Sequence, residues 1–445
     1  MSDTKKVGMV SLGCSKNQVD SEIMLSKLNE GGFVLSADPN ECDAVIINTC
    51  GFIEDAKREA IETILEFCEM KREGQIKAVI VTGCLAERYR DELAAEIPEA
   101  DVVLGLGKNG DIVKAVTTAL EGGRMVEFGE KTDLPLNGSR ILANPNYFAY
   151  LKLGDGCDNW CTYCAIPSIR GRFRSRTMED ILAEANNLAK MGVKELNLIA
   201  QDVSRYGEDL YGKSRLPELL TELCKIDGIE WIRLLYCYPD RITDELLQVM
   251  ASEEKIVKYL DMPLQHANGR VLKKMNRFGN REVITELVNR IRKTIPGITL
   301  RTTLIAGFPS ETPEEFTELC EMVKELKFER LGCFAYSPEE GTPASRMPDQ
   351  LDEREKQHRA EIVMTEQYAV AMEVGERQIG KRMRVLVEGY DAELNQYYGR
   401  SAMDAPDIDT KVYFKGSKFT KAGSFVTVKI KKLREYDLLG IQVAE

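Results

Sequence analysis

Three apolar, β-branched stretches near the start of the chain each end in a cysteine beside a glycine. They lie at residues 7–14, 44–51 and 78–84. Stretches with helical periodicity accompany them, at residues 21–30, 54–71 and 87–97. Strands that alternate with helices indicate a parallel sheet. In such a sheet functional groups collect beyond the carboxyl ends of the strands, which is where all three cysteines fall.

The middle of the chain repeats the alternation of strand and helix six times. Strand-like runs lie at residues 147–153, 193–201, 229–237, 259–265, 298–308 and 330–337. Helical patterns between them include residues 178–191, 244–254, 281–294 and 314–326. Six such units predict a partial parallel (βα)6 barrel with its site at the carboxyl ends of the strands. An open, doubly wound sheet fits the same pattern.

Changes of pattern divide the chain into four parts, and its fold class is predicted to be α/β with a small all-β end. Residues 1–127 form an α/β domain, and residues 128–146, rich in Pro, Gly and Asn, form a linker. The barrel takes residues 147–375, including a charged trailing helix. Residues 376–445 alternate as short strands and predict a small β-barrel.

Composition indicates a soluble protein of several domains, with 43% hydrophobic and 30% charged residues in 445. We find neither a secretory signal nor an apolar run of about 20 residues, so we expect a cytoplasmic protein without a membrane partner. Its twelve cysteines would then be reduced. The net charge of −12 disfavours a surface that binds nucleic acid throughout and suits a basic protein partner. Residues 376–445 depart from this, with three more basic than acidic residues.

Cys157, Cys161 and Cys164 follow the first barrel strand with the spacing C-x₃-C-x₂-C. Three thiolates this close can ligate three irons of a four-iron cluster, which leaves the fourth iron open for chemistry. A zinc ion is the alternative. It would need a fourth ligand, and the only histidines in the chain are His266 and His358.

Cys14, Cys50 and Cys84 are too far apart in sequence for their spacing to carry information. Their shared position at strand ends brings them together, because adjacent parallel strands lie about 4.8 Å apart. One such cysteine is typical of a buried core residue. Three in matching positions predict a second metal cluster.

The spacing at residues 157–164 resembles the signature of radical-SAM enzymes. The resemblance implies that S-adenosylmethionine binds the open iron and is cleaved to a 5′-deoxyadenosyl radical. Together the three parts resemble the methylthiotransferases over almost the whole chain, with a TRAM domain at the end. That family implies two [4Fe-4S] clusters, the second one on the N-terminal cysteines. One S-adenosylmethionine methylates a sulfur there, and another yields the radical that removes hydrogen from the target carbon.

Shorter motifs resemble the branch that modifies the β-carbon of an aspartate in small-subunit ribosomal protein twelve. They include Ser-Leu-Gly-Cys-Ser-Lys-Asn at residues 11–17, Pro-Leu-Gln-His at 263–266 and the acidic stretch at 402–409. The resemblance implies that protein as substrate, free or in the ribosomal subunit, an electron donor such as flavodoxin or ferredoxin, and a sulfur donor. Relatives that modify tRNA would carry Pro-Val-Gln-Ser-Gly from residue 263. A tRNA adenosine methylthiotransferase and a non-catalytic iron–sulfur or zinc-binding module remain the alternatives.

Polar residues at the ends of barrel strands are candidates for binding S-adenosylmethionine. They are Gln201, Asp202, Gln265 and Arg301. Arg301 could bind a carboxylate through two hydrogen bonds, and a structural salt bridge is the alternative for each of the four. The basic run at residues 170–176 is either a solvated face or a counter-charge for the cluster. The acidic stretch at 402–409 is either a solvated turn or a dock for a lysine-rich loop.

Overall fold

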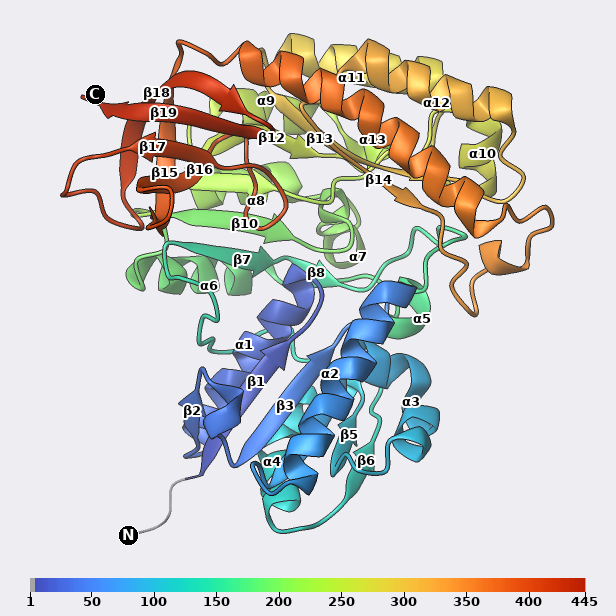
Figure 1. Cartoon of the computed structure of the whole chain (residues 1–445), viewed down its shortest axis with the longest axis vertical. Helices are drawn as coiled ribbons and strands as arrows, with labels where there is room; N and C mark the ends of the chain where they lie inside the picture. Colours follow the sequence, from blue (N-terminus) through green and yellow to red (C-terminus); the bar gives the residue numbers. More distant parts are fainter. Residues whose placement is uncertain (1–4, 445) are drawn as a thin grey trace.

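The N-terminal part is a parallel sheet covered by helices on both faces (Figure 1). The computed structural model describes residues 5–444, so residues 1–4 and 445 of the predicted end domains lie outside it. The strand order is β2-β1-β3-β4-β5-β6. The strands are β1 (Lys6–Ser11), β2 (Val34–Ser36), β3 (Ala44–Thr49), β4 (Ala78–Gly83), β5 (Val102–Leu104) and β6 (Met125–Glu127). Both central strands, β3 and β4, are buried along their whole length, which explains their continuous apolar sequence.

Four helices cover the two faces of this sheet. Helices α2 (Glu54–Arg72) and α3 (Cys84–Glu96) pack on one side of the sheet. Helices α1 (Ser15–Glu30) and α4 (Ile112–Leu120) pack on the other. Because β1, β3 and β4 are neighbours, the three strands that precede cysteines end side by side.

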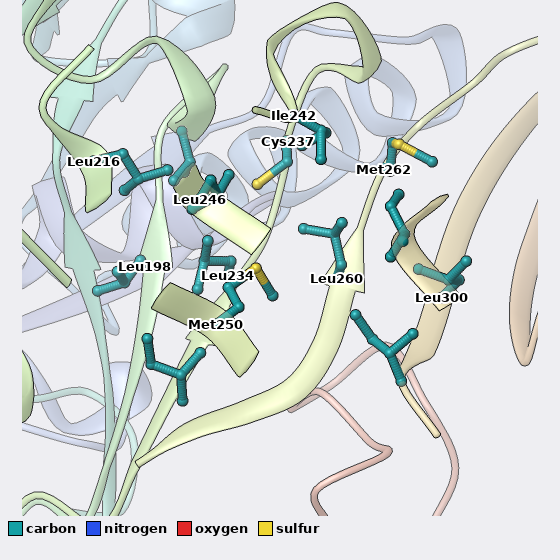
Figure 2. Packing of buried hydrophobic residues seen from close by; sticks show 14 of the residues in the cluster. Leu198, Leu216, Leu234, Cys237, Ile242, Leu246, Met250, Leu260, Met262 and Leu300 are labelled. Atoms are coloured by element: carbon teal, nitrogen blue, oxygen red, sulfur yellow. The ribbon is translucent and has the colours of Figure 1, made fainter. Parts of the chain in front are cut away.

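The middle part is a partial barrel of six parallel strands in the order β14-β13-β12-β11-β10-β7. The strands are β7 (Phe148–Lys152), β10 (Glu195–Ile199), β11 (Trp231–Leu234), β12 (Ile256–Asp261), β13 (Thr299–Ala306) and β14 (Arg330–Ala335). The outer helices are α6 (Met178–Lys190), α8 (Leu216–Cys224), α9 (Asp244–Ser252), α11 (Arg281–Thr294) and α12 (Pro313–Leu326). Figure 2 shows side chains of this layer, including Leu234 and Cys237, packed between strands and helices.

Shorter elements surround the carboxyl ends of the barrel strands. They are the two-stranded hairpin of β8 (Gly154–Asp155) and β9 (Arg174–Ser175), with α5 (Ile166–Arg170), α7 (Glu208–Tyr211) and α10 (Gly269–Lys274). Helix α13 (Glu353–Glu376) follows the last strand and packs along β14 and α12. Strand β12 ends four residues before Gln265, which the sequence pattern had placed at a strand end.

The C-terminal part is a closed barrel of five strands in the order β15-β16-β17-β19-β18. The strands are β15 (Arg382–Asp391), β16 (Gln396–Ser401), β17 (Val412–Lys415), β18 (Phe425–Arg434) and β19 (Asp437–Val443). The predicted fold class is confirmed: an α/β part, a partial (βα)6 barrel and a small β-barrel follow one another.

The small barrel and α1 both pack on the inner face of the large barrel. Val19 and Ile23 of α1 share one apolar cluster with Trp231 and Tyr259 of the strands and with Leu386, Ala405 and Phe425 of the small barrel. A buried ion pair joins Arg400 to Glu195 at 2.6 Å. Tyr259 also donates a hydrogen bond to Asp409 at 2.6 Å.

The segment at residues 128–146 has little regular structure, but it is anchored. Arg140 is buried and pairs with Glu22 of α1 and Glu184 of α6, and it also donates to the carbonyl of Tyr150 at 2.8 Å. One buried arginine of this segment therefore joins the N-terminal part to the barrel.

A loop after β14 forms a second connection between the two parts. Its Glu339 is 3% exposed and lies 2.9 Å from Arg88 and 3.2 Å from Lys57, both on N-terminal helices. Further along the same loop, the amide of Ala344 donates to the carbonyl of Thr162 at 2.9 Å. The loop thus holds helices α2 and α3 at one end and the loop of Cys161 and Cys164 at the other.

Candidate active site

The structure brings the three N-terminal cysteine loops together. Cys14 directly precedes α1, Cys50 directly follows β3 and Cys84 begins α3. Gly13 has a φ of +88°, and a Cβ atom there would lie 2.9 Å from the sulfur of Cys50. Only glycine permits that backbone conformation and that approach.

The thiols of this group interact electrostatically. Burial raises the pKa of Cys50 and raises that of Cys84 to about 12, and negative charge on Cys14 raises both further. Arg170 acts in the opposite direction on both thiols. A bound metal deprotonates such thiols outright, so these three residues fit a metal cluster.

The second cysteine group lies in the loop after β8. Backbone hydrogen bonds hold this loop: the amide of Cys157 donates to Gly171 at 3.1 Å, and that of Thr162 to Met275 at 3.1 Å. Burial raises the pKa of Cys157 to about 11, and burial together with the charge of Cys161 raises that of Cys164. These thiols also act on one another and fit a cluster by their donor chemistry.

Within residues 5–444 no three side chains of His, Cys, Asp or Glu gather closely enough to hold one ion. The ligands of one zinc ion all lie within about 2.3 Å of it. In a four-iron cluster each thiolate binds a different iron, so its sulfur atoms stand further apart.

Arg277 and Tyr238 lie against Cys161, and sequence reasoning missed both. The guanidinium of Arg277 lies 3.8 Å from the sulfur of Cys161 and 3.7 Å above the ring of Tyr238. The hydroxyl of Tyr238 is 3.0 Å from the same sulfur. Arg277 is buried and offsets negative charge on this loop. Its place after a lysine-rich helix gave no signal, because such a position is typical of a helix end.

A buried ionic network connects the two cysteine groups. Arg170 donates to Asp155 at 2.7 Å, to Asp20 at 3.0 Å and to Asn17 at 2.5 Å. The amide oxygen of Asn17 is 3.5 Å from the sulfur of Cys84. Asp155 lies two residues before Cys157. Although burial acts to raise the pKa of Asp155, Arg170 and Lys152 hold it below its usual value.

The basic run at residues 170–176 is therefore not a solvated face throughout. Arg170 and Arg176 are 2% and 3% exposed. Arg176 donates to the carbonyl of Lys152 at 2.9 Å. Arg172 does reach solvent, so the arginines of this run divide between the interior and the surface.

Two of the four candidates for binding S-adenosylmethionine lie beside the loop of Cys157. The amide nitrogen of Gln201 donates to Asp155 at 3.1 Å, and its oxygen has no partner in the part of the chain that the structure describes. Asp202 is buried and accepts from Asn159 at 2.9 Å. Burial raises the pKa of Asp202 despite these hydrogen bonds.

The other two candidates are placed differently. Gln265 has a φ of 76°, and its amide oxygen has no partner among the described residues. Arg301 lies 2.9 Å from Asp261 and 3.6 Å from Asp409, so it already has carboxylate partners within the chain. His266 is fully buried, and its Nε2 atom lies 3.3 Å from a carboxylate oxygen of Glu311.

Two aspartates of the acidic stretch at residues 402–409 face inward, and the predicted role as a dock is wrong for these two. Asp404 is buried and lies 2.5 Å from Arg330. Asp409 is buried between Arg301 and Tyr259. These carboxylates hold the small barrel to the large one, which leaves them no free charge for a lysine-rich loop.

Lys16 and Tyr236 meet between the two cysteine groups, and sequence reasoning assigned a role to neither. Lys16 is 5% exposed, and its ammonium lies 2.9 Å from the ring centre of Tyr236. Tyr236, just beyond β11, has a φ of 60°. Burial lowers the pKa of Lys16 to about 8, while charges on Cys14 and Asp261 act to raise it.

Comparison with known families divides the chain in the same order. Residues 6–105 match a family described as uncharacterized protein family UPF0004. Residues 151–323 match the radical SAM superfamily, and residues 379–443 match the TRAM domain. No helix within residues 5–444 has the length and apolar character that a membrane span requires.

Two relatives are similar over nearly the full length. The ribosomal protein uS12 methylthiotransferase RimO of Clostridioides difficile (strain 630) is 50% identical over 440 residues, which cover 98% of each chain. The RimO of Thermoanaerobacter sp. (strain X514) is 50% identical over 98% of this chain and 99% of its own. The solved radical S-adenosylmethionine methyltransferase TsrM of Kitasatospora setae shares the fold, with a TM-score of 0.58 at 15% identity over 77% of each chain.

The fold and the site define a radical-SAM methylthiotransferase, with a cysteine-bearing α/β part before the barrel and a TRAM barrel after it. Identity of 50% over 98% of the chain also settles the branch. The chain belongs to the RimO family.

Proposed function

We propose that this enzyme inserts a CH₃–S group at the β-carbon of an aspartate in ribosomal protein uS12. Cys157, Cys161 and Cys164 hold one [4Fe-4S] cluster, where S-adenosylmethionine binds. Cys14, Cys50 and Cys84 hold the second, auxiliary cluster. The proposal rests chiefly on the buried network around Arg170, which connects the two cysteine groups through two hydrogen bonds. The names of these relatives, ribosomal protein uS12 methylthiotransferases, support uS12 as the target.

When bound, the cluster on the barrel and S-adenosylmethionine supply the radical that removes a hydrogen atom. The chain contributes charge balance and shelter. Arg277 beside Cys161 offsets the negative charge of the thiolates. Half-buried Tyr163 and buried Tyr238 wall the site against water, which a radical site has to exclude. Gln201 and Gln265 offer buried amide oxygens to the ammonium or hydroxyl groups of S-adenosylmethionine.

The domain division proposed for this function is an N-terminal sulfur-handling domain (1–127), a connecting segment (128–146), the radical barrel with its trailing helix (147–375) and the TRAM barrel (376–445). The enzyme would act in the cytoplasm, with an electron donor such as flavodoxin or ferredoxin and a separate sulfur donor. Iron analysis of anaerobically reconstituted protein tests the cluster count. We expect about eight irons per chain, and stoichiometric zinc would contradict the assignment.

A tRNA adenosine methylthiotransferase is the second candidate, and the surface of the TRAM barrel favours it. Lys411 lies 4.8 Å from the ring centre of Tyr398, and Arg434 lies 4.8 Å from that of Tyr413. Cations interleaved with aromatic rings are typical of surfaces that bind single-stranded nucleic acid.

Mass spectrometry distinguishes the two substrates. The reconstituted enzyme is incubated with S-adenosylmethionine, a sulfide source and a reductant, together with uS12 in one reaction and bulk tRNA in the other. We expect uS12 alone to gain the mass of CH₃–S minus one hydrogen, on a single aspartate. A gain on tRNA alone would overturn the proposed function.

A further inference from the structure

Lys16 and Arg277 differ from the other buried cations among the described residues, because neither has a carboxylate partner; Arg277 lies against Cys161 instead. Lys152, Arg170 and Arg233 are almost fully buried, and each lies within 3.0 Å of a carboxylate. Among residues 5–444, no carboxylate oxygen lies within 4.0 Å of the ammonium of Lys16. A buried cation without an anion is costly, so a protein that retains one has a use for it.

The ammonium of Lys16 points to the barrel. It contacts the face of the Tyr236 ring, beyond the carboxyl end of β11. The negative charge of Asp261, at the end of β12, also acts on it electrostatically. It makes no hydrogen bond to the sulfur of Cys14 among the described residues. Lys16 is therefore placed between the auxiliary cysteines and the mouth of the barrel.

The backbone around Lys16 also indicates a binding site. Tyr236, whose ring the ammonium contacts, is not glycine and yet has a φ of 60°. Such strain clusters at functional sites. A buried cation thus meets a strained backbone position at the mouth of the barrel, and no carboxylate among the described residues pairs with it.

We propose that Lys16 binds the carboxylate of the target aspartate and so selects a protein side chain as substrate. This inference rests on the proposed function. The carboxylate of aspartate is attached directly to the β-carbon, so an ion pair with Lys16 fixes the reacting carbon one bond away. Asparagine lacks the charge, and a nucleobase lacks both the charge and the shape of the group. Discrimination arises because either one leaves Lys16 unpaired.

Binding measurements test this pairing separately from turnover. Fluorescence anisotropy gives the affinity of reconstituted enzyme for recombinant uS12 and for uS12 in which the target aspartate is changed to asparagine. We expect the native enzyme to prefer aspartate by roughly 10- to 100-fold, as for a hydrogen bond to a charged group. Lys16→Met should bind both proteins equally, and Lys16→Arg should restore part of the preference. Lys27→Met, on the same helix, is the matched control and should keep the native preference.

Each other outcome overturns the inference. If Lys16→Met still prefers aspartate by the native factor, Lys16 does not bind the carboxylate. If Lys16→Met loses about four irons per chain, Lys16 serves the auxiliary cysteines instead. Formation of 5′-deoxyadenosine without uS12 should remain at the native level in Lys27→Met. Failure of the native enzyme to modify uS12 would refute the proposed function, whereas modification of uS12 with an unaffected Lys16→Met refutes only this inference.

Discussion

Glu339 is the carboxylate whose removal should most clearly separate the N-terminal part from the barrel. It is shared by Arg88 and Lys57, whose side chains are only 8% and 11% exposed. Arg88 also donates to the carbonyls of Gly51 and Glu340, at 2.8 Å each. Through Arg88, Glu339 therefore acts on the residue next to Cys50.

The free-energy cost of removing Glu339 depends on the partners that Arg88 and Lys57 keep. Removing one partner of a buried ion pair costs about 3–5 kcal/mol. In Glu339→Ala, Arg88 retains two carbonyls and Lys57 retains Glu54 at 2.6 Å. We therefore expect the lower end, about 3 kcal/mol, which corresponds to a change on the order of 100-fold in the equilibrium for opening the loop.

Hydrogen exchange measures that opening directly. The amide of Ala344, bonded to Thr162 in the loop of Cys161 and Cys164, should exchange on the order of 100-fold faster in Glu339→Ala. Glu340→Ala is the control, because its side chain is exposed and its carbonyl remains. Formation of 5′-deoxyadenosine without methylthio product should rise as the two cysteine groups lose their fixed separation. An unchanged rate at Ala344 would refute the reasoning.

Three further predictions concern the cysteines and the buried charges. Changing Cys14, Cys50 and Cys84 together to alanine should stop product formation and leave some cleavage of S-adenosylmethionine; product from that variant would disprove the auxiliary site. Arg277→Met should lower the reduction potential of the barrel cluster, because a positive charge beside Cys161 is lost; potentiometry with EPR detection checks this, and an unchanged potential would contradict it. Burial raises the pKa of Glu195, but Arg400 and Arg233 outweigh it, so its pKa is lowered. Its stabilising contribution is therefore present above an unfolded-state pKa of about 4.3 and lost as pH falls below that value; Glu195→Gln should flatten the acid limb of the unfolding curve, and an unaltered limb would argue against the pairing.

The sequence predicted the large barrel well because strand-like runs alternate regularly with helical patterns, and because β7, β10 and β11 are buried along their whole length. The short strands β2, β5 and β6 were missed, since three residues carry too little pattern. Strand β16 was missed because its sequence, Gln-Tyr-Tyr-Gly-Arg-Ser, is polar. Pro263 explains the early end of β12, because proline cannot donate the next ladder hydrogen bond.

The site was predictable where chemistry is carried by residue type and loop position, as for the six cysteines. It was not predictable where partners come from distant parts of the chain. Arg301 pairs with Asp409, more than one hundred residues later, so no local signal separates a salt bridge from a cofactor ligand. Lys16 and Arg277 stand in ordinary helical contexts, and only the folded chain shows that each is buried.

The way the small barrel packs into the large one has a consequence for radical chemistry. Arg400 pairs with Glu195 at the start of β10, and Asp409 accepts a hydrogen bond from Tyr259 of β12. Arg233 of β11 donates to the carbonyl of Ala402 in the small barrel. The TRAM barrel therefore acts as the floor of the reaction chamber, whatever else its outer surface binds. A chain ending after α13 would keep all six cysteines and yet admit solvent from below. Its radical would then be quenched by hydrogen donors that the intact protein keeps out.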